Sequence, residues 1–238
     1  MLFVLHFILL IGNVELNQGP ESIHYSSAPS FECPSSWTIC NIKIRSIRNK
    51  LDFFHNFTEE FDIVTETETH LDPTIDNRDI EIDSFSKNII RKDRYRFGGE
   101  LLIFCKEDIS LIHKREFENQ IDETLWVEVR AKGQRFLLCN TYRPEWTDYE
   151  YWARLTHVIE MAYQLCENIV LTGDLNSDLF NAHNNRLIDI LNLYDMKNVI
   201  TKPTRVTDHS RTLLDPLIYF RSWWRRPGEN YSERLNAK

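Results

Sequence analysis

Oxygen-bearing side chains follow several apolar segments of this 238-residue sequence. They are Glu68 at the end of "FDIVTETE", Tyr142 at the end of "FLLCNTY", Asp174 and Asn176 after "NIVLTG", and Asp215 in "TLLD". In α/β folds, functional sites are built at strand ends and in the loops beyond them. Oxygen ligands without neighbouring His or Cys suit Mg²⁺ or Mn²⁺. Taken singly, each residue is better interpreted as a solvated loop residue or a helix cap; the joint arrangement favours a site, which composition and spacing alone do not prove.

The segment "IVLTGDLNSD" contains one of only seven glycines in the sequence. On an extended segment, Asp174 and Asn176 would project to the same side because they are two residues apart. We expect the strand to break at Gly173, where the missing Cβ would let the backbone turn without a clash.

The rest of the pattern alternates between strands and helices. Strands are predicted within 37–44, 61–68, 98–106, 168–176, 198–207 and 212–220, and a hairpin within 125–144 that turns at Lys132 and Gly133. Helices are predicted over 47–57, with Ser46 as the N-cap, and within 148–167 and 184–196. This order favours an α/β protein with mixed sheets covered by helices.

Composition limits the partners. The net charge of −8 excludes a broad positive surface, so a nucleic acid would be bound through a local basic patch or through metal ions. "RKDRYR" offers Arg91, Arg94 and Arg96 for phosphates and Tyr95 for stacking, or is a solvated turn. The five cysteines show no CxxC pair, which argues against a disulfide framework or a zinc site and favours a reducing compartment.

The chain divides into three parts. Residues 1–36 hold an apolar run, too short to span a bilayer but compatible with a signal peptide, and a Ser/Pro-rich linker. Residues 37–220 form the expected domain, and 221–238 a divergent tail. No membrane association and no stable small-molecule ligand are expected; a cytoplasmic or nuclear location is favoured.

Several motifs occur in one order along the chain: "IRSIRNKLD", "DIVTETETHLD", "RKDRYRFGGELLIF", "YRP", "IVLTGDLNSDL", "NNRLIDILN" and "PTRVTDHSRTLLD". From Trp37 to Tyr219, the chain resembles the endonuclease/exonuclease/phosphatase domain of non-LTR, LINE-type retrotransposons. "NVELNQGP" resembles a degraded 2A-like peptide, the ribosome-skipping element also found in such retrotransposons.

The resemblance implies a four-layer α/β sandwich of two packed mixed sheets, DNase I-like, and a metal-dependent enzyme that nicks DNA beside a reverse transcriptase. Glu68 matches the family's metal ligand, and Asp174 the Asp that orients or deprotonates water. Asn176 and Tyr142 match residues that position the scissile phosphate, and Asp215 one that supports the site.

Three departures from the family pattern predict impaired activity. Lys43 stands where the family has an Asn ligand, with Asn41 two residues earlier, and Glu100 replaces a glycine. The family's terminal Ser-Asp-His does not follow Asp215, and Asp208-His209 is interpreted as a loop dipeptide. A weakened endonuclease, a catalytically silent binding unit and, less favoured, a superfamily phosphatase all remain open.

Overall fold

The fold is described from a computed structural model, which covers residues 37–44, 46–47, 60–83, 85–93, 100–147, 149–183 and 185–220, together with the backbone of 5–10. The expected helix over 47–57 and the 2A-like segment lie largely or wholly outside these residues.

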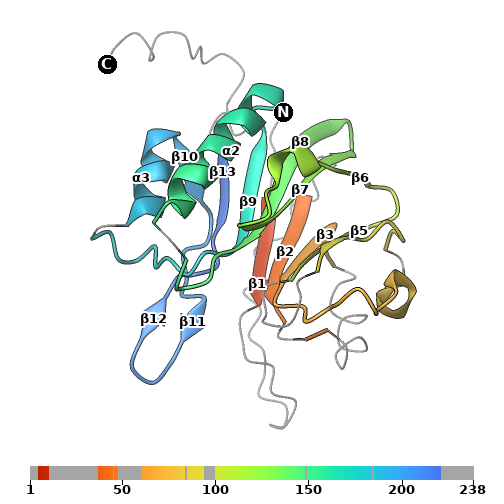
Figure 1. Ribbon diagram of the computed structural model, residues 1–238, viewed down its shortest axis with the longest axis horizontal. Helices are drawn as coiled ribbons and strands as arrows, with labels where there is room; N and C mark the ends of the chain where they lie inside the picture. Colours follow the sequence, from red (N-terminus) through yellow and green to blue (C-terminus); the bar gives the residue numbers. More distant parts are fainter. Residues whose placement is uncertain are drawn as a thin grey trace.

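Two mixed sheets form the centre of the molecule (Figure 1). The five-stranded sheet has the order β1-β2-β3-β5-β4 and consists of β1 (Leu5–Leu10), β2 (Trp37–Lys43), β3 (Ile63–Thr67), β4 (Ile90–Lys92) and β5 (Leu101–Cys105). The six-stranded sheet has the order β10-β13-β9-β8-β7-β6 and consists of β6 (Ser110–His113), β7 (Glu123–Ala131), β8 (Gln134–Tyr142), β9 (Ile169–Asp174), β10 (Met196–Asn198) and β13 (Leu217–Phe220).

Short elements complete the described fold. The 3₁₀ helices are η1 (Asn77–Ile80) and η2 (Arg115–Phe117), and the α-helices are α2 (Tyr151–Leu165) and α3 (Arg186–Leu193). The strands β11 (Arg205–Val206) and β12 (Arg211–Thr212) form a small hairpin that projects from the body (Figure 1). No helix with described placement is long and apolar enough to cross a bilayer.

Burial follows the strand period. Alternate residues of the two sheets, such as Ile39, Ile63, Val127 and Val170, point inward and form one core between them. The opposite face of the six-stranded sheet packs against α2 and α3 (Figure 1), whose apolar stripes sit on side chains such as Leu171. The fold is therefore the expected pair of packed mixed sheets, with helices on an outer face.

The predicted hairpin is confirmed, including its turn. Lys132 and Gly133 connect β7 to β8 and both have positive φ, 54° and 69°. Positive φ at both central positions is the type I′ geometry that matches strand twist in two-residue hairpins.

The backbone of β1 pairs in parallel with β2, from Leu5 opposite Trp37 to Leu10 opposite Ile42. The five-stranded sheet therefore includes a segment from outside the 37–220 range expected for the domain. This strand covers the edge of β2, whose backbone groups would otherwise lack ladder partners on that side.

The expected break at Gly173 is wrong, because β9 continues through Asp174. Gly173 lies opposite Thr141 of β8 and has a φ of 125°, and a Cβ placed on it would lie 1.9 Å from the carbonyl oxygen of Thr141. The glycine thus allows two strands to approach closely, a requirement set by a residue 32 positions away in the sequence that no local pattern reveals.

Gly173→Ala should destabilise the protein by about 3 kcal/mol or more, because it combines an unfavourable φ with a backbone clash. Gly133→Ala is the matched control: its φ is also positive, but a Cβ there meets nothing within 4 Å. We expect the control to cost about 1 kcal/mol. Urea unfolding of both variants measures the difference, and equal losses would contradict the close-approach role of Gly173.

Candidate active site at the strand ends

The topology brings the predicted site residues to one end of the two sheets. β2 and β3 are parallel, as are β8 and β9, so Lys43, Glu68, Tyr142 and Asp174 lie at or just beyond carboxyl ends. β13 runs antiparallel to β9, and Asp215 precedes it at the same end. Residues from five separate segments of the sequence therefore meet.

Lys43 lies at the centre of this group. Its Nζ is 3.0 Å from Oε1 of Glu68 and 2.7 Å from Oδ2 of Asp174. The ammonium also lies 5.8 Å from the centre of the Tyr142 ring, within cation–π range. Burial alone would lower the pKa of Lys43, but the charges and hydrogen bonds of Asp174 and Glu68 outweigh it and the pKa is raised. The lysine is firmly protonated and bridges two carboxylates.

Asp174 and Asn176 are linked through the backbone. The carboxylate of Asp174 is buried, and its Oδ1 accepts a hydrogen bond of 3.1 Å from the backbone N–H of Asn176. Asn176 has a φ of 44°, and its side-chain amide donates to the carbonyl oxygen of Arg143 at 2.8 Å. Burial raises the pKa of Asp174 although Lys43 acts in the opposite direction.

Asp215 lies beside this group and is 4% exposed. Its backbone N–H donates to Oγ1 of Thr204 at 3.1 Å. Burial first, and then the charge of Asp174, raises the pKa of Asp215 from 3.8 to about 7. Burial likewise raises the pKa of Tyr142 to about 12, so its hydroxyl keeps its proton near neutrality. The site thus holds a carboxyl that exchanges its proton near neutral pH.

Glu100, which was noted in the sequence only as a departure from the family, supports the loop that carries Glu68. Glu68 and His70 have positive φ values of 57° and 53°. Oε2 of Glu100 accepts a hydrogen bond of 3.0 Å from the backbone N–H of His70. The backbone carbonyl oxygen of Glu100 accepts one of 3.4 Å from the backbone N–H of Thr69. A buried carboxylate thus stabilises a backbone conformation that L-residues rarely adopt.

Asn41, two residues before Lys43, belongs to the core rather than to the site. It is 2% exposed, and its Oδ1 accepts a 3.1 Å hydrogen bond from Thr65. Asp208 and His209 lie exposed in the β11–β12 turn, as the loop interpretation expected.

The basic segment expected to contact nucleic acid is described only in part. Arg91 donates to the carbonyl oxygen of Ile75 at 2.7 Å and pairs with Asp93 at 3.1 Å, and its side chain is 15% exposed. These contacts commit Arg91 to the fold and leave little of it for a phosphate. Arg94, Tyr95 and Arg96 lie outside the described residues.

The arrangement does not fit a divalent cation as it stands. A metal bridging Glu68 and Asp174 would need the space that the Lys43 ammonium fills at hydrogen-bond distance from both. Across the described residues, no group of three or more His, Cys, Asp or Glu side chains could hold a metal ion. The carboxylates are satisfied by a fixed organic cation instead.

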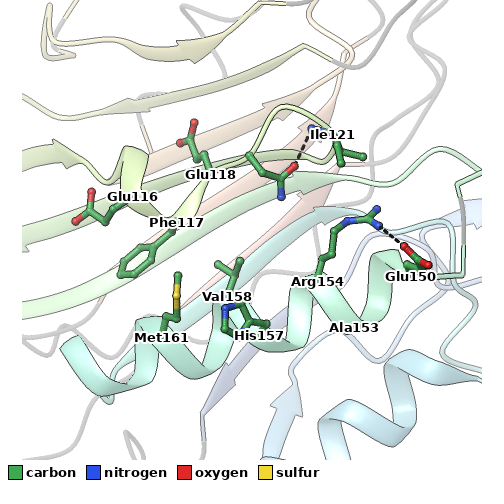
Figure 2. Close-up of a pocket in the computed structure, with 11 residues that line it drawn as sticks. Glu116, Phe117, Glu118, Ile121, Glu150, Ala153, Arg154, His157, Val158 and Met161 are labelled. Atoms are coloured by element: carbon green, nitrogen blue, oxygen red, sulfur yellow. Dashed lines mark hydrogen bonds and ion pairs between the residues drawn. The ribbon is translucent and has the colours of Figure 1, made fainter.

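A separate cavity lies away from this group. A space of about 700 Å³ opens between η2 and α2, where Phe117, Val158 and Met161 form an apolar floor beside Glu116 and Glu150 (Figure 2). None of the predicted site residues lines it. It is therefore distinct from the carboxylate–lysine group, which consists of Lys43, Glu68 and Asp174.

Comparison of the sequence with protein-family models finds no match, and comparison with curated proteins finds none either. The structure does match solved structures. The endonuclease domain of TRAS1, a telomere-specific non-LTR retrotransposon, superposes with a TM-score of 0.57 and 12% identity over 77% of this chain and 83% of that one.

Two further matches come from bacteria. The 3′ phosphatase NExo from Neisseria, bound to a product DNA hairpin, gives a TM-score of 0.57 at 12% identity over 77% of this chain and 86% of that one. An endonuclease/exonuclease/phosphatase family protein from Bacteroides thetaiotaomicron gives 0.53 at 13% identity over 73% of each chain. The chain therefore has the DNase I-like fold of these proteins.

Asp215 should make the stability of the protein depend on pH. Its pKa is about 7 in the folded state against 3.8 ordinarily, so between these values the folded protein holds a proton that the unfolded chain releases. The stability of the folded state therefore falls as the pH rises from 3.8 to about 7. Above pH 7 the loss stays constant, because Asp215 is charged in both the folded and the unfolded state. Asp215→Asn, which mimics the protonated form, should melt at a higher temperature than the parent protein at about pH 8, and the difference should narrow as the pH falls and close only near the ordinary pKa of 3.8.

Melting curves over a pH series measure this effect, with Asp208→Asn in the exposed hairpin turn as the control. A difference between Asp215→Asn and the parent protein that stays constant with pH would contradict the raised pKa.

Proposed function

We propose that this chain is a phosphodiesterase domain of retrotransposon origin that acts on DNA, and that its Mg²⁺- or Mn²⁺-dependent nicking is weak or absent because Lys43 takes the place of the metal ion. The observation that carries the proposal is the double ion pair of Lys43 with Glu68 and Asp174, at 3.0 and 2.7 Å. Similarity to a retrotransposon endonuclease and to a phosphatase bound to a DNA hairpin supports the substrate class.

The remaining residues suit hydrolysis of a phosphodiester. A carboxylate at Asp174 can orient and accept a proton from water, and the Asn176 amide and Tyr142 hydroxyl can donate to a phosphate. All three groups are already engaged: Asp174 with Lys43, Asn176 with the carbonyl of Arg143, and Tyr142 with Glu68. These contacts would have to loosen before the groups could act on a substrate.

Electrostatics explains why the lysine would block the metal. A unit charge about 4 Å from a divalent ion repels it by on the order of several kcal/mol at the effective dielectric of a partly buried site. Each 1.4 kcal/mol is about a tenfold loss in affinity, so millimolar Mg²⁺ would bind poorly. A metal ion could bind Glu68 and Asp174 only after the Lys43 ammonium had left both carboxylates.

A second candidate function is a domain that binds DNA without cleaving it. The same ion pairs favour it, because Lys43 satisfies both carboxylates and leaves a folded, charge-balanced site. Plasmid nicking in Mg²⁺ or Mn²⁺ separates the two candidates. Nicking that Asp174→Ala abolishes would favour the weakened enzyme. No nicking by the parent protein, with DNA binding retained, would favour the binding domain.

Lys43→Asn should convert the site to one that binds metal. Without metal the variant should be less stable than the parent protein by about 3 kcal/mol, because Glu68 and Asp174 face each other without a counter-charge. Millimolar Mg²⁺ or Mn²⁺ should restore much of this loss and give a calorimetric binding signal, while the parent protein should respond to neither ion.

Lys132→Asn is the matched control. Lys132 has the same 25% side-chain exposure as Lys43 and pairs with Asp62 at 2.8 Å, at the opposite end of the strands. The preference of Asn for positive φ in this turn offsets part of the lost ion pair, so the diagnostic readout is that metal ions leave the stability of Lys132→Asn unchanged. Equal metal affinities for the Lys43→Asn variant and the parent protein would mean that Lys43 does not guard the site.

A further inference from the structure

A polar cavity of about 270 Å³ lies next to the candidate active site. Arg143, Trp152, Asp178, His183 and Arg186 are among the residues that line it. It shares a wall with the carboxylate–lysine group, because the backbone N–H of Arg143 donates to the carbonyl oxygen of Asp174 at 2.8 Å. A ligand that filled this cavity would reach the edge of the site.

Each arginine of the cavity lies against an aromatic ring. Cζ of Arg143 lies 4.9 Å from the ring centre of Trp152, and Cζ of Arg186 lies 4.9 Å from that of Tyr149. Stacking fixes the plane of a guanidinium and leaves its N–H edges available, which is the geometry used to grip phosphate oxygens in pairs. The cavity therefore presents two guanidinium groups, each beside an aromatic ring.

The charge of these arginines is only weakly neutralised. Arg143 makes no ion pair within the described residues, its Nη1 donates to two carbonyls at a long 3.4 Å, and its Nε is buried without a partner. Arg186 is 52% exposed and approaches Asp189 only to 3.8 Å. The carboxylate that lines the cavity, Asp178, accepts backbone N–H groups from Phe180 and Leu213 at 3.1 and 2.9 Å. The described lining therefore sets two guanidinium groups against one carboxylate, an excess of positive charge that favours an anion.

Two exposed aromatic rings follow Arg143 in the segment between β8 and α2. Trp146 and Tyr149, between β8 and α2, are 77% and 69% exposed. Large exposed aromatics beside arginines are the combination that proteins use to bind single strands, with bases stacked on rings and phosphates held by cations. Both features come from residues 143–152 and 178–186, outside the carboxylate–lysine group.

We propose that this cavity binds a backbone phosphate of a single-stranded nucleic acid, with Arg143 and Arg186 as its ligands and Trp146 or Tyr149 as a base-stacking surface. The proposal rests on the proposed function for the nucleic-acid class of the ligand. It does not require metal, so the domain would hold a strand beside the candidate site even while Lys43 closes that site to divalent ions.

The test is fluorescence anisotropy of a labelled single-stranded 12-nucleotide DNA with the full chain in EDTA, over a salt series. Arg186→Gln and Arg143→Lys should each weaken binding about tenfold, as expected for one lost charge-assisted contact. Arg186→Gln should also reduce the slope of log K against log salt by about 0.7. Arg130→Gln is the control. The side chain of Arg130 is 56% exposed, similar to the 52% of Arg186, but it pairs with Glu128 near the far end of β7. This variant should bind the DNA as the parent protein does.

The outcomes separate this inference from the proposed function. If the parent protein binds the oligonucleotide and neither variant weakens binding, the cavity assignment is overturned and the proposed function stands. The same holds if the protein nicks or binds duplex plasmid but does not bind the single strand. Inorganic phosphate that competes as well as an unlabelled oligonucleotide, phosphate for phosphate, would overturn the nucleic-acid assignment. Arg186→Gln changes an exposed side chain and decides the question even if Arg143→Lys does not fold, which melting curves would reveal.

Discussion

The site depends on balancing buried negative charge. Three carboxyl groups, of Glu68, Asp174 and Asp215, meet at one end of the sandwich, where the sheets exclude most water. Carboxylates in such surroundings must find a cation, a proton or hydrogen-bond donors. Lys43 supplies the cation to two of them, and a raised pKa supplies a proton to the third near neutrality. How each charge is neutralised decides whether the site can accept anything else.

The backbone around this group is held in uncommon conformations. Glu68, His70 and Asn176 all have positive φ although none is glycine, and Gly173 has a φ of 125°. Positive φ is unfavourable for side chains with a Cβ and persists where surrounding contacts enforce it. Here the contacts are the Glu100 carboxylate at His70 and the Arg143 carbonyl at Asn176. Their concentration at one end of the molecule agrees with a site whose geometry matters more than its local stability.

The sequence predicts much of the fold because strand period, helix period and turn chemistry are local. The β7–β8 hairpin turns at Lys132 and Gly133, where a glycine, which adopts positive φ freely, occurs between two alternating segments. The strand ends that carry Glu68, Tyr142 and Asp174 follow from the same periodicity. That these ends meet could be expected from the resemblance to a known fold, but not from spacing alone.

The contacts that were missed depend on distant residues. Gly173 is explained by the backbone of Thr141 in the neighbouring strand, and the role of Glu100 by a loop 30 residues earlier. The second ion pair of Lys43 crosses from one sheet to the other, to a residue 131 positions away. The pairing of β1 with β2 joins segments that no short pattern connects. Such contacts are set by the packing of the sheets, so they become visible only in three dimensions.

The position of Lys43 has a genetic consequence. Codons for lysine and asparagine differ only in the third base, so a single transversion exchanges the ammonium at this strand end for an amide. On the proposal that Lys43 excludes the metal, one nucleotide separates a silent form of this domain from one that could bind a divalent ion. On the proposed retrotransposon origin, an element carrying the domain could lose or regain that property within a lineage while the two sheets, their core and the neighbouring arginines stay unchanged.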